Sequence, residues 1–323
     1  MISLTLPAPA KINLTLDILG ARPDGYHEME MVMQSVSLCD TIRLDLGFAG
    51  GVRASSGLQF LPNDKDNLAV AAALAFRKAT GQTWRDLLIT IEKRIPVCAG
   101  TAGGSSDAAA VLRGLNELTD AGLSPQALAK IGEEVGSDVP YCVLGTTALA
   151  GGRGEALAPL SPLPPCWIVL CKPRFSISTP ALFRAWDKGK RRLRPDTKGI
   201  LLALEAGDLV EVARRMFNVF EGVLPPTQQR EIESIKTALL TAGALGAAMS
   251  GSGPTVFGVF REKALARSAV ALLREDYEEV FLTEPLSGPL PALQEIQVYR
   301  PKTPSILSVQ ILVLRKWTVF LCV

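Results

Sequence analysis

Residues 95–110 read IPVCAGTAGGSSDAAA, a segment that concentrates glycine, serine and alanine. Apolar residues recur at helical spacing over residues 111–118, so the segment is predicted to be a loop that leads into a helix. Ser105 or Ser106 is expected to cap this helix, and Asp107 suits its first turn. Because the loop lacks bulky side chains, its backbone N–H groups can bind a phosphate at the helix N-terminus. The alternative is a tight turn before a core helix.

Two common phosphate-binding loops do not fit this segment. The G-x-x-x-x-G-K-[ST] loop requires a lysine after its last glycine, but Ser105 follows Gly104. The G-x-G-x-x-G loop requires a second glycine where Ala102 stands, two residues after Gly100. A nicotinamide-dependent oxidoreductase, the generic interpretation of a glycine loop, is therefore disfavoured.

The segment resembles the P-x-x-x-G-L-G-S-S-A/G-G-S-S-D loop of the GHMP kinases, a family of small-molecule kinases. It matches one branch of that family at Pro96, Gly100, Gly103, Gly104, Ser105, Ser106 and Asp107. Thr101 and Ala102 depart from the pattern, because the family prefers Leu-Gly there. If position 102 requires a positive φ, alanine is strained and ATP affinity is expected to fall. The resemblance implies that ATP is bound by Pro96, Val97, Cys98, Ala99, Gly100, Thr101, Ala102, Gly103, Gly104, Ser105 and Ser106.

Composition limits the broad class of protein. A chain of 323 residues can form two domains that each bury a core, and 48% hydrophobic with 20% charged residues is typical of globular proteins. The net charge of +2 implies no bulk attraction to nucleic acid or membrane. Six scattered cysteines without C-x-x-C, and one histidine, give no zinc pattern and favour a reduced, cytosolic setting. The N-terminus lacks the pattern of a signal peptide.

Two strands are predicted at residues 3–6 and 11–18, where apolar and polar residues alternate. Ala8-Pro9-Ala10 between them favours an extended chain. Lys11 and Asn13 share the polar face of the second strand, and a solvated lysine at a strand end is one explanation of Lys11. The opening P-A-P-A-K-I-N-L also resembles the same kinase branch, which implies a catalytic Lys11 and a substrate-binding Asn13.

Residues 22–27 read RPDGYH and are predicted to form a turn. His27 is the one histidine of the chain, and a lone histidine usually has a structural or solvated role. Because Tyr26 precedes it directly, the pair could instead stack on a base and hydrogen-bond to its edge. D-G-Y-H resembles one branch of the GHMP kinases, in which these residues hold a cytidine. The resemblance implies that Tyr26 and His27 bind substrate.

Between residues 36 and 91 the pattern predicts a strand, a loop, a helix and a strand, at residues 36–46, 47–57, 66–80 and 87–91. The resemblance places Asn67 and Lys93 near the adenine of ATP. A helix cap and a surface lysine explain these two residues equally well.

A further helix is predicted to begin at Ser124-Pro125 and to end at Gly136. Asp138 follows in the sequence S-D-V-P and either caps a short turn or takes part in catalysis. G-S/A-D-V-P resembles the kinase branch, in which this aspartate is catalytic. Residues 151–154 form a second glycine-rich turn, similar to a family segment that borders the substrate.

Residues 159–165 read PLSPLPP and are the candidate linker between two domains. Beyond it a strand is predicted at residues 167–171. Three helices are predicted to follow: one that begins at residue 178, one at residues 208–219 and one at residues 231–241. Thr179 and Phe183 are explained as parts of a capped helix, or by resemblance as residues that bind the nucleotide half of the substrate. The basic stretch 188–198 is expected to be a solvated loop. Residues 247–260 resemble the third GHMP motif, whose small residues let it approach the first glycine loop.

Together these motifs imply an α+β fold of two domains, with the active site between them. An N-terminal mixed-sheet α/β domain is expected at residues 1–160, and a C-terminal ferredoxin-like domain at residues 161–288. Residues 289–323 are an atypical tail, rich in proline and then in apolar residues, and too interrupted for a membrane span.

The resemblance also implies a reaction, in which the γ-phosphoryl group of ATP passes to the 2-hydroxyl of a cytidine diphosphate-linked methylerythritol in non-mevalonate isoprenoid biosynthesis. Mg²⁺ would bridge the phosphates with Ser106 as a ligand, and Asp138 would accept the hydroxyl proton beside Lys11. Tyr26 and Phe183 would sandwich the pyrimidine.

Other functions stay open at this point. A homoserine or mevalonate kinase would share the loops but lack Tyr26 and His27, and a nucleotide-binding protein would hold ATP without turnover. No nucleic-acid or membrane partner is expected, and the protein is expected to be a monomer or a homodimer.

Overall fold

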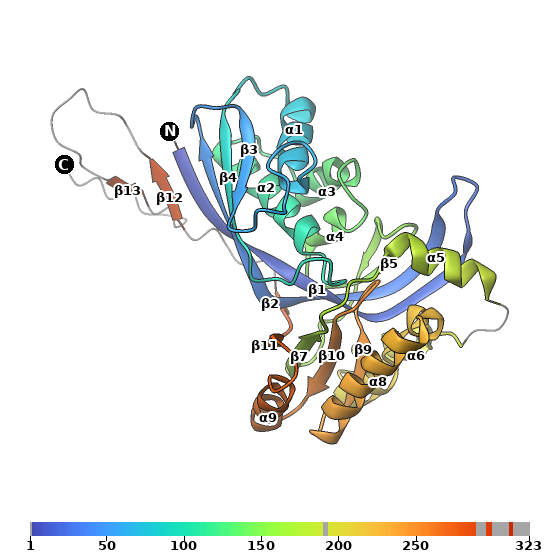
Figure 1. The fold of residues 1–323 in the computed structure, drawn as a ribbon. Coiled ribbons are helices and arrows are strands. Elements are labelled where there is room, and N and C mark those ends of the chain that lie inside the picture. Colours follow the sequence, from blue (N-terminus) through green and yellow to red (C-terminus); the bar gives the residue numbers. More distant parts are fainter. Residues whose placement is uncertain (1, 190–192, 289–294, 299–309, 313–323) are drawn as a thin grey trace.

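The computed structural model describes residues 2–189, 193–288, 295–298 and 310–312. In this part of the chain the strands form one sheet of nine strands and one of four, with helices packed on each (Figure 1). The strands of the larger sheet are β1 (Ile2–Ala21), β2 (His27–Leu46), β3 (Val52–Ser56), β4 (Leu87–Glu92), β5 (Thr147–Gly151), β6 (Ala156–Pro159), β8 (Phe217–Asn218), β12 (Glu295–Val298) and β13 (Gln310–Leu312).

β1 and β2 are the longest elements, with 20 residues each, and they pair as an antiparallel hairpin. The two strands predicted at residues 3–6 and 11–18 are therefore one continuous strand. The pairing shifts register between Pro9 and Lys11, and such a bulge tolerates a proline that has no N–H to donate. The strand predicted at residues 36–46 likewise begins earlier, at His27.

The loop predicted at residues 47–57 is wrong, because β3 forms there and pairs in parallel with β4. Ala54 is the one fully buried residue of β3, so this strand shows almost no alternation of apolar and polar residues. A sequence pattern cannot identify a strand of this kind, because edge pairing rather than burial holds it.

Four helices pack on one face of the larger sheet: α1 (Leu68–Thr80), α2 (Gly103–Leu118), α3 (Pro125–Glu133) and α4 (Val139–Leu144) (Figure 1). The predicted C-terminal end of α1 is confirmed, whereas the helix begins at Leu68, two residues after the predicted start at residue 66. The Asn67 side chain accepts a hydrogen bond of 2.9 Å from the Ala69 N–H, and Gly81 ends the helix with a φ of 64°. Ser124 caps α3, also as predicted.

The smaller sheet has the order β11 (Glu279–Thr283), β7 (Trp167–Lys172), β10 (Val256–Phe260) and β9 (Gly246–Met249), and all its pairs are antiparallel. Helices α8 (Pro226–Thr241) and α9 (Lys263–Leu273) connect β7 to β9 and β10 to β11. This β-α-β-β-α-β arrangement, with strand order 4-1-3-2, confirms the predicted ferredoxin-like topology.

The remaining helices are α5 (Thr179–Lys188), α6 (Thr197–Glu205), α7 (Leu209–Arg214) and a 3₁₀ helix, η1 (Val219–Val223). The single helix predicted at residues 208–219 is wrong beyond Arg214. Asp208 caps α7 as its first turn begins, but the chain then pairs β8 with β1. That pairing is a tertiary contact, which overrides the local helical pattern.

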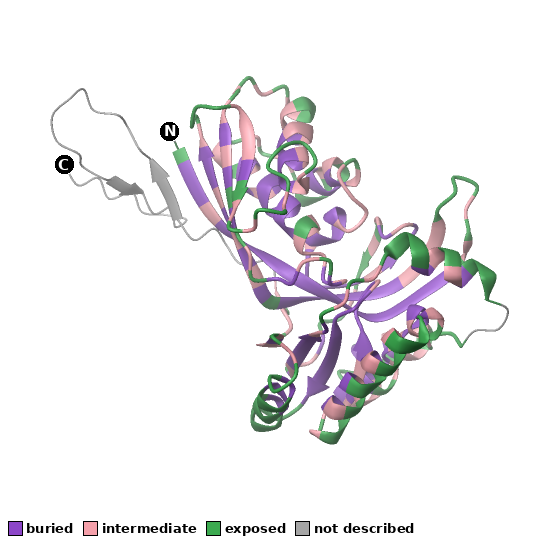
Figure 2. Cartoon of the chain, viewed as in Figure 1, coloured by how far each residue is buried: buried purple, intermediate pink, exposed green. Residues whose placement is uncertain are grey.

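The core comprises two clusters of buried side chains, and β1 contributes to both. Leu6 and Leu16 belong to the cluster under α1 and α2, whereas Ile12 and Leu14 pack with the smaller sheet. Figure 2 accordingly shows the central parts of β1 and β2 buried. The boundary predicted at residue 160 lies between β6 and β7, but the two long strands pack against both halves of the molecule.

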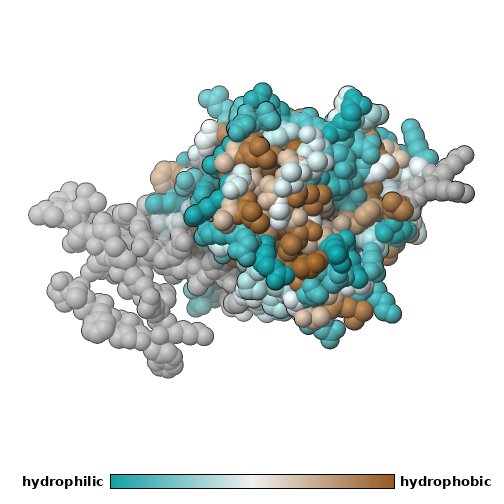
Figure 3. Space-filling view, turned by 90° about the horizontal axis from the view of Figure 1, so that it is seen from below, coloured by the Kyte–Doolittle hydropathy of each residue, from teal (hydrophilic) through white to brown (hydrophobic). Residues whose placement is uncertain are grey.

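The lower half of the molecule presents a mixed surface, in which apolar side chains lie among hydrophilic ones (Figure 3). Exposed leucines on α6, α8 and α9 are Leu202, Leu240, Leu265 and Leu272. The tail predicted at residues 289–323 lies outside the described residues except for β12 and β13. The basic stretch 188–198 also lies partly outside them.

Candidate active site

A cavity of about 570 Å³ opens between the two halves of the molecule. Its walls come from β1, the loop before α2, the starts of α1, α4 and α5, and the turn between β9 and β10. Its volume is in the range of pockets that hold a cofactor or small ligand, which is ~300–1,000 Å³.

The loop before α2 presents free backbone N–H groups to this cavity. Gly100 and Ala102 have φ values of 75° and 56°, so the positive φ considered for position 102 is present. Ala102 is the N-cap residue of α2 and provides no side-chain hydrogen bond. The first N–H groups of any α-helix lack partners within the helix, so here they are available to an anion.

The predicted serine cap of α2 is wrong. Helix α2 begins two residues earlier than Ser105, at Gly103. The Ser106 hydroxyl lies inside the helix, is buried, and donates a hydrogen bond of 2.7 Å to the Pro9 carbonyl. It thereby fixes α2 against the bulge of β1 instead of satisfying the N–H groups of the first turn.

A second glycine loop, between β9 and β10, crosses the first one backbone to backbone. A Cβ atom on Gly100 would lie 2.1 Å from the Ser250 carbonyl oxygen, and one on Gly251 would lie 2.7 Å from the Gly100 oxygen. The Ser250 hydroxyl donates to that same Gly100 oxygen at 3.0 Å. The close approach predicted for these two motifs is thus confirmed, and glycine is required on both sides of it.

Lys11 and Asp138 form a pair at the base of the cavity. The Lys11 Nζ atom donates to Asn13 Oδ1 at 2.7 Å and to the Gly100 carbonyl at 3.1 Å, and lies 3.6 Å from Asp138 Oδ2. The lysine is 4% exposed, which excludes a solvated strand end, whereas the Asp138 side chain is 32% exposed. Asp138 precedes α4 without a side-chain capping bond, so the cap explanation is wrong. The pair places an accessible carboxylate beside a buried ammonium group.

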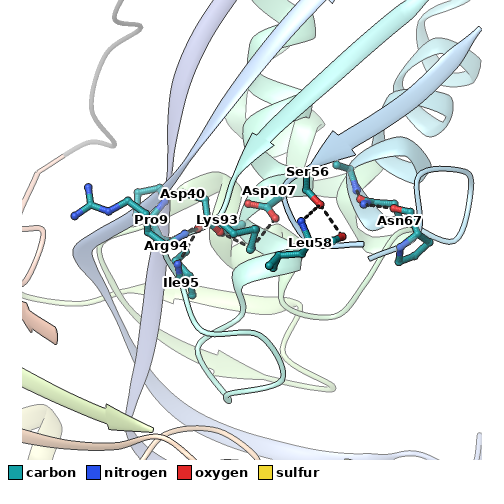
Figure 4. Close-up of polar contacts among 12 residues, drawn as sticks. Pro9, Asp40, Ser56, Leu58, Asn67, Lys93, Arg94, Ile95 and Asp107 are labelled. Carbon is teal, nitrogen blue, oxygen red and sulfur yellow. Dashed lines mark hydrogen bonds and ion pairs between the residues drawn. The ribbon is translucent and has the colours of Figure 1, made fainter. Parts of the chain in front are cut away.

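A buried ion cluster lies beneath the start of α2 (Figure 4). Lys93 Nζ forms ion pairs with Asp40 and, at 2.9 Å, with Asp107 Oδ2. Asp40 Oδ1 also accepts backbone N–H bonds from Arg94 at 2.5 Å and Ile95 at 2.8 Å. Lys93 is therefore not a surface lysine, and the cluster fixes the segment that enters the glycine loop.

The charges of this cluster are not balanced. Burial raises the pKa of Asp107 to about 7, although Lys93 opposes that rise, and Asp107 Oδ1 has no hydrogen-bond partner among the described residues. Burial alone would lower the pKa of Lys93, but Asp107 and Asp40 together raise it. One lysine ammonium group thus forms ion pairs with two carboxyl groups in a buried site.

The other end of the cavity is aromatic. The rings of His27 and Phe183 stack with centroids 4.6 Å apart, and His27 Nε2 lies 2.8 Å from Asp187 Oδ1. Tyr26 is 54% exposed, and the Arg153 guanidinium lies 4.4 Å from the centre of its ring. Because the ring stacked on Phe183 here is His27, the sandwich of a pyrimidine between Tyr26 and Phe183 stays a prediction.

Most of the predicted site residues line this one cavity. Those that do are Lys11, Asn13, Asn67, Lys93, Pro96, Val97, Cys98, Ala99, Gly100, Ala102, Gly103, Gly104, Ser105, Asp138, Thr179 and Phe183. Four do not: Thr101, Ser106, Tyr26 and His27. Thr101 is fully buried and holds β1 through its carbonyl, which accepts the Lys11 N–H at 3.1 Å.

Sequence reasoning missed several residues of the site. Asp40 is the one charged residue within the stretch VSLCDTI, which is a usable signal for a buried, paired carboxylate. Ser252, whose hydroxyl lies 2.9 Å from that of Thr179, joins α5 to the second glycine loop. Arg153 stands in the glycine-rich turn 151–154, but its side chain was assigned no role there. Asp187 had no signal in the sequence, because its partner His27 lies far away along the chain.

Among the described residues there is neither a membrane-spanning helix nor a cluster of metal ligands. Their helices include none with both the length and the apolar character needed to cross a bilayer. Within the same residues, no cluster of three or more His, Cys, Asp or Glu side chains could hold a metal ion.

The chain is similar to known proteins over most of its length. The family models for the GHMP kinases N terminal domain and the GHMP kinases C terminal match residues 67–146 and 200–279. The 4-diphosphocytidyl-2-C-methyl-D-erythritol kinase of Alkaliphilus metalliredigens is 44% identical over 289 residues, which cover 89% of this chain and 98% of that protein. A protein of the same name from Pelotomaculum thermopropionicum is 45% identical over 280 residues, covering 87% and 97%.

Solved structures agree with these sequence relatives. A crystal structure of 4-(cytidine 5'-diphospho)-2C-methyl-D-erythritol kinase superposes with a TM-score of 0.73 at 33% identity, covering 88% of this chain and 100% of that one. The homoserine kinase of Cytophaga hutchinsonii superposes with a TM-score of 0.68 at 19% identity, covering 89% and 96%. At that lower identity the likeness shows a shared fold and nothing about the substrate.

Proposed function

The chain belongs to the GHMP kinase family, and from that premise we propose that it is an ATP-dependent kinase acting on 4-diphosphocytidyl-2-C-methyl-D-erythritol. The reaction transfers the γ-phosphoryl group to the 2-hydroxyl of this acceptor, a step of non-mevalonate isoprenoid biosynthesis. The observation that carries the proposal is the Lys11–Asp138 pair, 3.6 Å apart, in the same cavity as the glycine loop.

The phosphate end of the cavity suits a nucleoside triphosphate. Phosphoryl transfer depends mainly on positioning and on charge stabilisation, so the protein needs fixed N–H donors more than reactive groups. The first turn of α2 and the loop from Pro96 provide those donors, and Asn67 and Lys93 lie on the side proposed for the adenine. The crossing of Gly100 and Gly251 keeps the loop in place without a ligand.

Asp138 is proposed to accept the proton of the attacking hydroxyl. Its carboxylate is open to the cavity, where a hydroxyl group can reach it, and the ammonium group of Lys11 lies 3.6 Å away. Lys11 is itself held by Asn13 and the Gly100 carbonyl, so its charge is fixed in place before the substrates bind. The same charge stabilises the phosphoryl group during transfer.

The residues fit a Mg²⁺ ion held mainly by phosphates and water. Mg²⁺ typically takes one or two protein oxygen ligands besides substrate phosphates, and Asp138 and Ser105 provide oxygen atoms in the cavity. When bound, the ion neutralises charge on the phosphate oxygens. Ser106, the ligand expected from the sequence, has its hydroxyl on the Pro9 carbonyl and outside the cavity lining. Ser105 is therefore the better placed of the two serines.

The aromatic end is proposed to bind the cytidine of the acceptor. Phe183 and Thr179 line the cavity, and His27 and Tyr26 lie at its rim.

Free thiols at Cys39, Cys98, Cys142, Cys166 and Cys171 are in keeping with a reducing compartment, and a cytoplasmic location is proposed on that basis. A monomer or a homodimer stays a prediction.

An assay of ATP consumption with a panel of acceptors tests the proposal. The cytidine-linked acceptor should be phosphorylated, whereas homoserine and mevalonate should not. Phosphorylation of either of those two instead would overturn the acceptor and leave the kinase activity standing.

The role of the base is tested by Asp138→Asn. Turnover should fall by about 10²–10⁴-fold, because a positioned base contributes roughly that factor, while ATP binding stays within a few-fold. Asp276→Asn, an exposed carboxylate on another surface, is the matched control. Near-normal turnover in Asp138→Asn would remove this residue from the mechanism.

A further inference from the structure

Among the described residues, Arg153 is the cation of the cavity that forms no ion pair with a carboxylate. Three basic side chains line the cavity: Lys11 is paired with Asp138, and Lys93 with Asp40 and Asp107. Within the described residues the Arg153 guanidinium forms no ion pair. Its neighbour Glu155 accepts a bond of 2.6 Å from the Arg153 backbone N–H, not from the side chain. The Arg153 charge helps to lower the pKa of Asp24, in the turn between β1 and β2, but it is the smallest of the causes that act on that carboxyl group.

The turn that carries Arg153 is held firmly at the hydroxyl end of the cavity. It joins β5 to β6. The Gly152 N–H donates to the Glu28 side-chain carboxylate at 3.0 Å, and the Gly152 carbonyl accepts the Met29 N–H at 2.7 Å. Gly154 has a φ of 121°, and a Cβ atom there would lie 3.4 Å from the Ser137 oxygen and 3.8 Å from Asp138 Oδ1. The backbone beside Arg153 therefore adjoins the proposed catalytic base.

The side chain extends from there to the opposite end of the site. Its guanidinium lies 4.4 Å from the centre of the Tyr26 ring, at the aromatic rim. Stacking on a ring uses the flat face of a guanidinium and leaves its N–H groups, which point outward in the plane, free for other partners. Arg153 thus spans the distance between the place proposed for the reacting hydroxyl group and the place proposed for the cytosine ring.

The acceptor has a diphosphate at the corresponding position, between its methylerythritol and its cytidine. Guanidinium groups bind phosphate oxygens through paired, charge-assisted hydrogen bonds. We propose that Arg153, oriented by Tyr26, binds the diphosphate of the acceptor and so sets the distance between the cytidine and the reacting hydroxyl. This inference rests on the proposed function, because it assigns a residue to one part of that substrate.

Competition by cytidine, CMP and CDP against the acceptor tests the inference, because these ligands differ only in phosphate. In the unaltered protein, the inhibition constant should fall from cytidine to CMP and from CMP to CDP. In Arg153→Gln the inhibition constant of cytidine should stay the same. The tighter binding that the phosphates provide should be lost, so that the inhibition constant of CDP rises about tenfold or more. The KM for ATP should stay within about twofold.

Two further variants make the result specific. Arg153→Lys keeps the charge but not the planar pairing, and should retain part of the phosphate gain. Arg184→Gln removes an exposed positive charge of α5 next to Phe183, and should leave the whole series unchanged. An equal loss for cytidine and CDP in Arg153→Gln would overturn the inference, as would an unchanged series.

Failure of the proposed function gives a different result. If the unaltered protein neither phosphorylates the acceptor nor binds cytidine nucleotides, the proposed function and this inference fall together. If it does both, and Arg153→Gln keeps the full phosphate gain, the inference alone is overturned.

Discussion

Ala102 has a left-handed backbone conformation, which is unfavourable for alanine, at the start of the helix that is proposed to face the phosphates. Its φ of 56° costs on the order of 1 kcal/mol for a residue with a Cβ atom. Ala102→Gly should therefore raise the free energy of unfolding by about that amount, or tighten ATP binding. Denaturant unfolding and ATP titration measure the two effects.

The same change at an ordinary helical position should have the opposite sign. Ala238→Gly, in the last turn of α8, should lower the free energy of unfolding by up to about 1 kcal/mol, because glycine loses more chain entropy on folding. If Ala102→Gly behaved like Ala238→Gly, the strain at Ala102 would be negligible and the entropy cost of glycine would dominate.

Asp107 should make the stability of the protein depend on pH. Burial raises the pKa of this carboxyl from an ordinary 3.8 to about 7. Its contribution to the free energy of unfolding is therefore intact below about pH 3.8 and is lost as the pH rises through 7. Asp107→Asn has no charge to bury, so its stability relative to the unaltered protein should improve between pH 5 and pH 8. Urea unfolding at both values measures this difference.

Glu117→Gln is the control for Asp107, because it removes an exposed carboxylate from the same helix. Its effect should be the same at pH 5 and pH 8. A constant difference between Asp107→Asn and the unaltered protein across this range would mean that Lys93 keeps the Asp107 carboxyl ionised throughout.

The site residues that sequence could identify are those in short, local patterns. Lys11, Asp138 and the loop from Pro96 each stand in a recognisable motif, and the structure brings them into one cavity. Asp40 and Asp107 meet on Lys93 from positions 53 and 14 residues away, which no local pattern shows. The Ser106 hydroxyl matches the motif, but its position is decided by the Pro9 carbonyl of a distant strand.

At the scale of one element, α5 fixes His27 from two sides. Phe183 and Asp187 are four residues apart and therefore on one face of the helix, where they contact the ring face and the Nε2 atom. A carboxylate can only accept a hydrogen bond, so neutral His27 must carry its proton on Nε2 and leave Nδ1 as an acceptor. An acceptor at that atom suits the amino group of cytosine and disfavours the carbonyl of uracil.

Histidine-selective ¹⁵N NMR tests this assignment cleanly, because the chain has one histidine. The unaltered protein should show the Nε2–H form, and Asp187→Ala should shift the signal toward a mixture of the two tautomers. The acceptor KM should rise with it while the KM for ATP stays the same. Lys188→Ala, in the last turn of the same helix, is the control. An Nδ1–H form in the unaltered protein would contradict the assignment.

Helices and strands could be predicted where nearby residues in the sequence decide them, through capping residues or a regular apolar pattern. Helix α1 has both its cap and its terminal glycine in the sequence, and β4 has clear alternation. β3 and β8 are held by pairing with distant strands and have little apolar pattern, so local sequence gave a loop and a helix instead. The separation predicted between the strands at residues 3–6 and 11–18 is wrong, because a bulge keeps Pro9 inside β1.

At the scale of the whole molecule, every residue that lines the cavity precedes residue 253. Deletion of residues 305–323 should therefore leave kcat and both KM values within about twofold. The deleted segment is apolar and rich in β-branched residues, so its removal should also reduce aggregation. Light scattering and steady-state kinetics measure these effects. Unfolding on truncation would show that the segment packs into the core.

The length of β1 and β2 limits how this kinase can open. A strand of 20 residues extends for about 65 Å, and these two stay paired beside both halves of the molecule, with shifts of register at bulges. Rotation of one half away from the other would have to bend or tear a continuous hydrogen-bonded ribbon, unlike closure about a loose linker. Movements that admit substrates are therefore expected in the loops around the cavity, among them the turn at residues 22–26, rather than in the two long strands. Product release is then expected to depend on those loops and not on a rotation of the two halves.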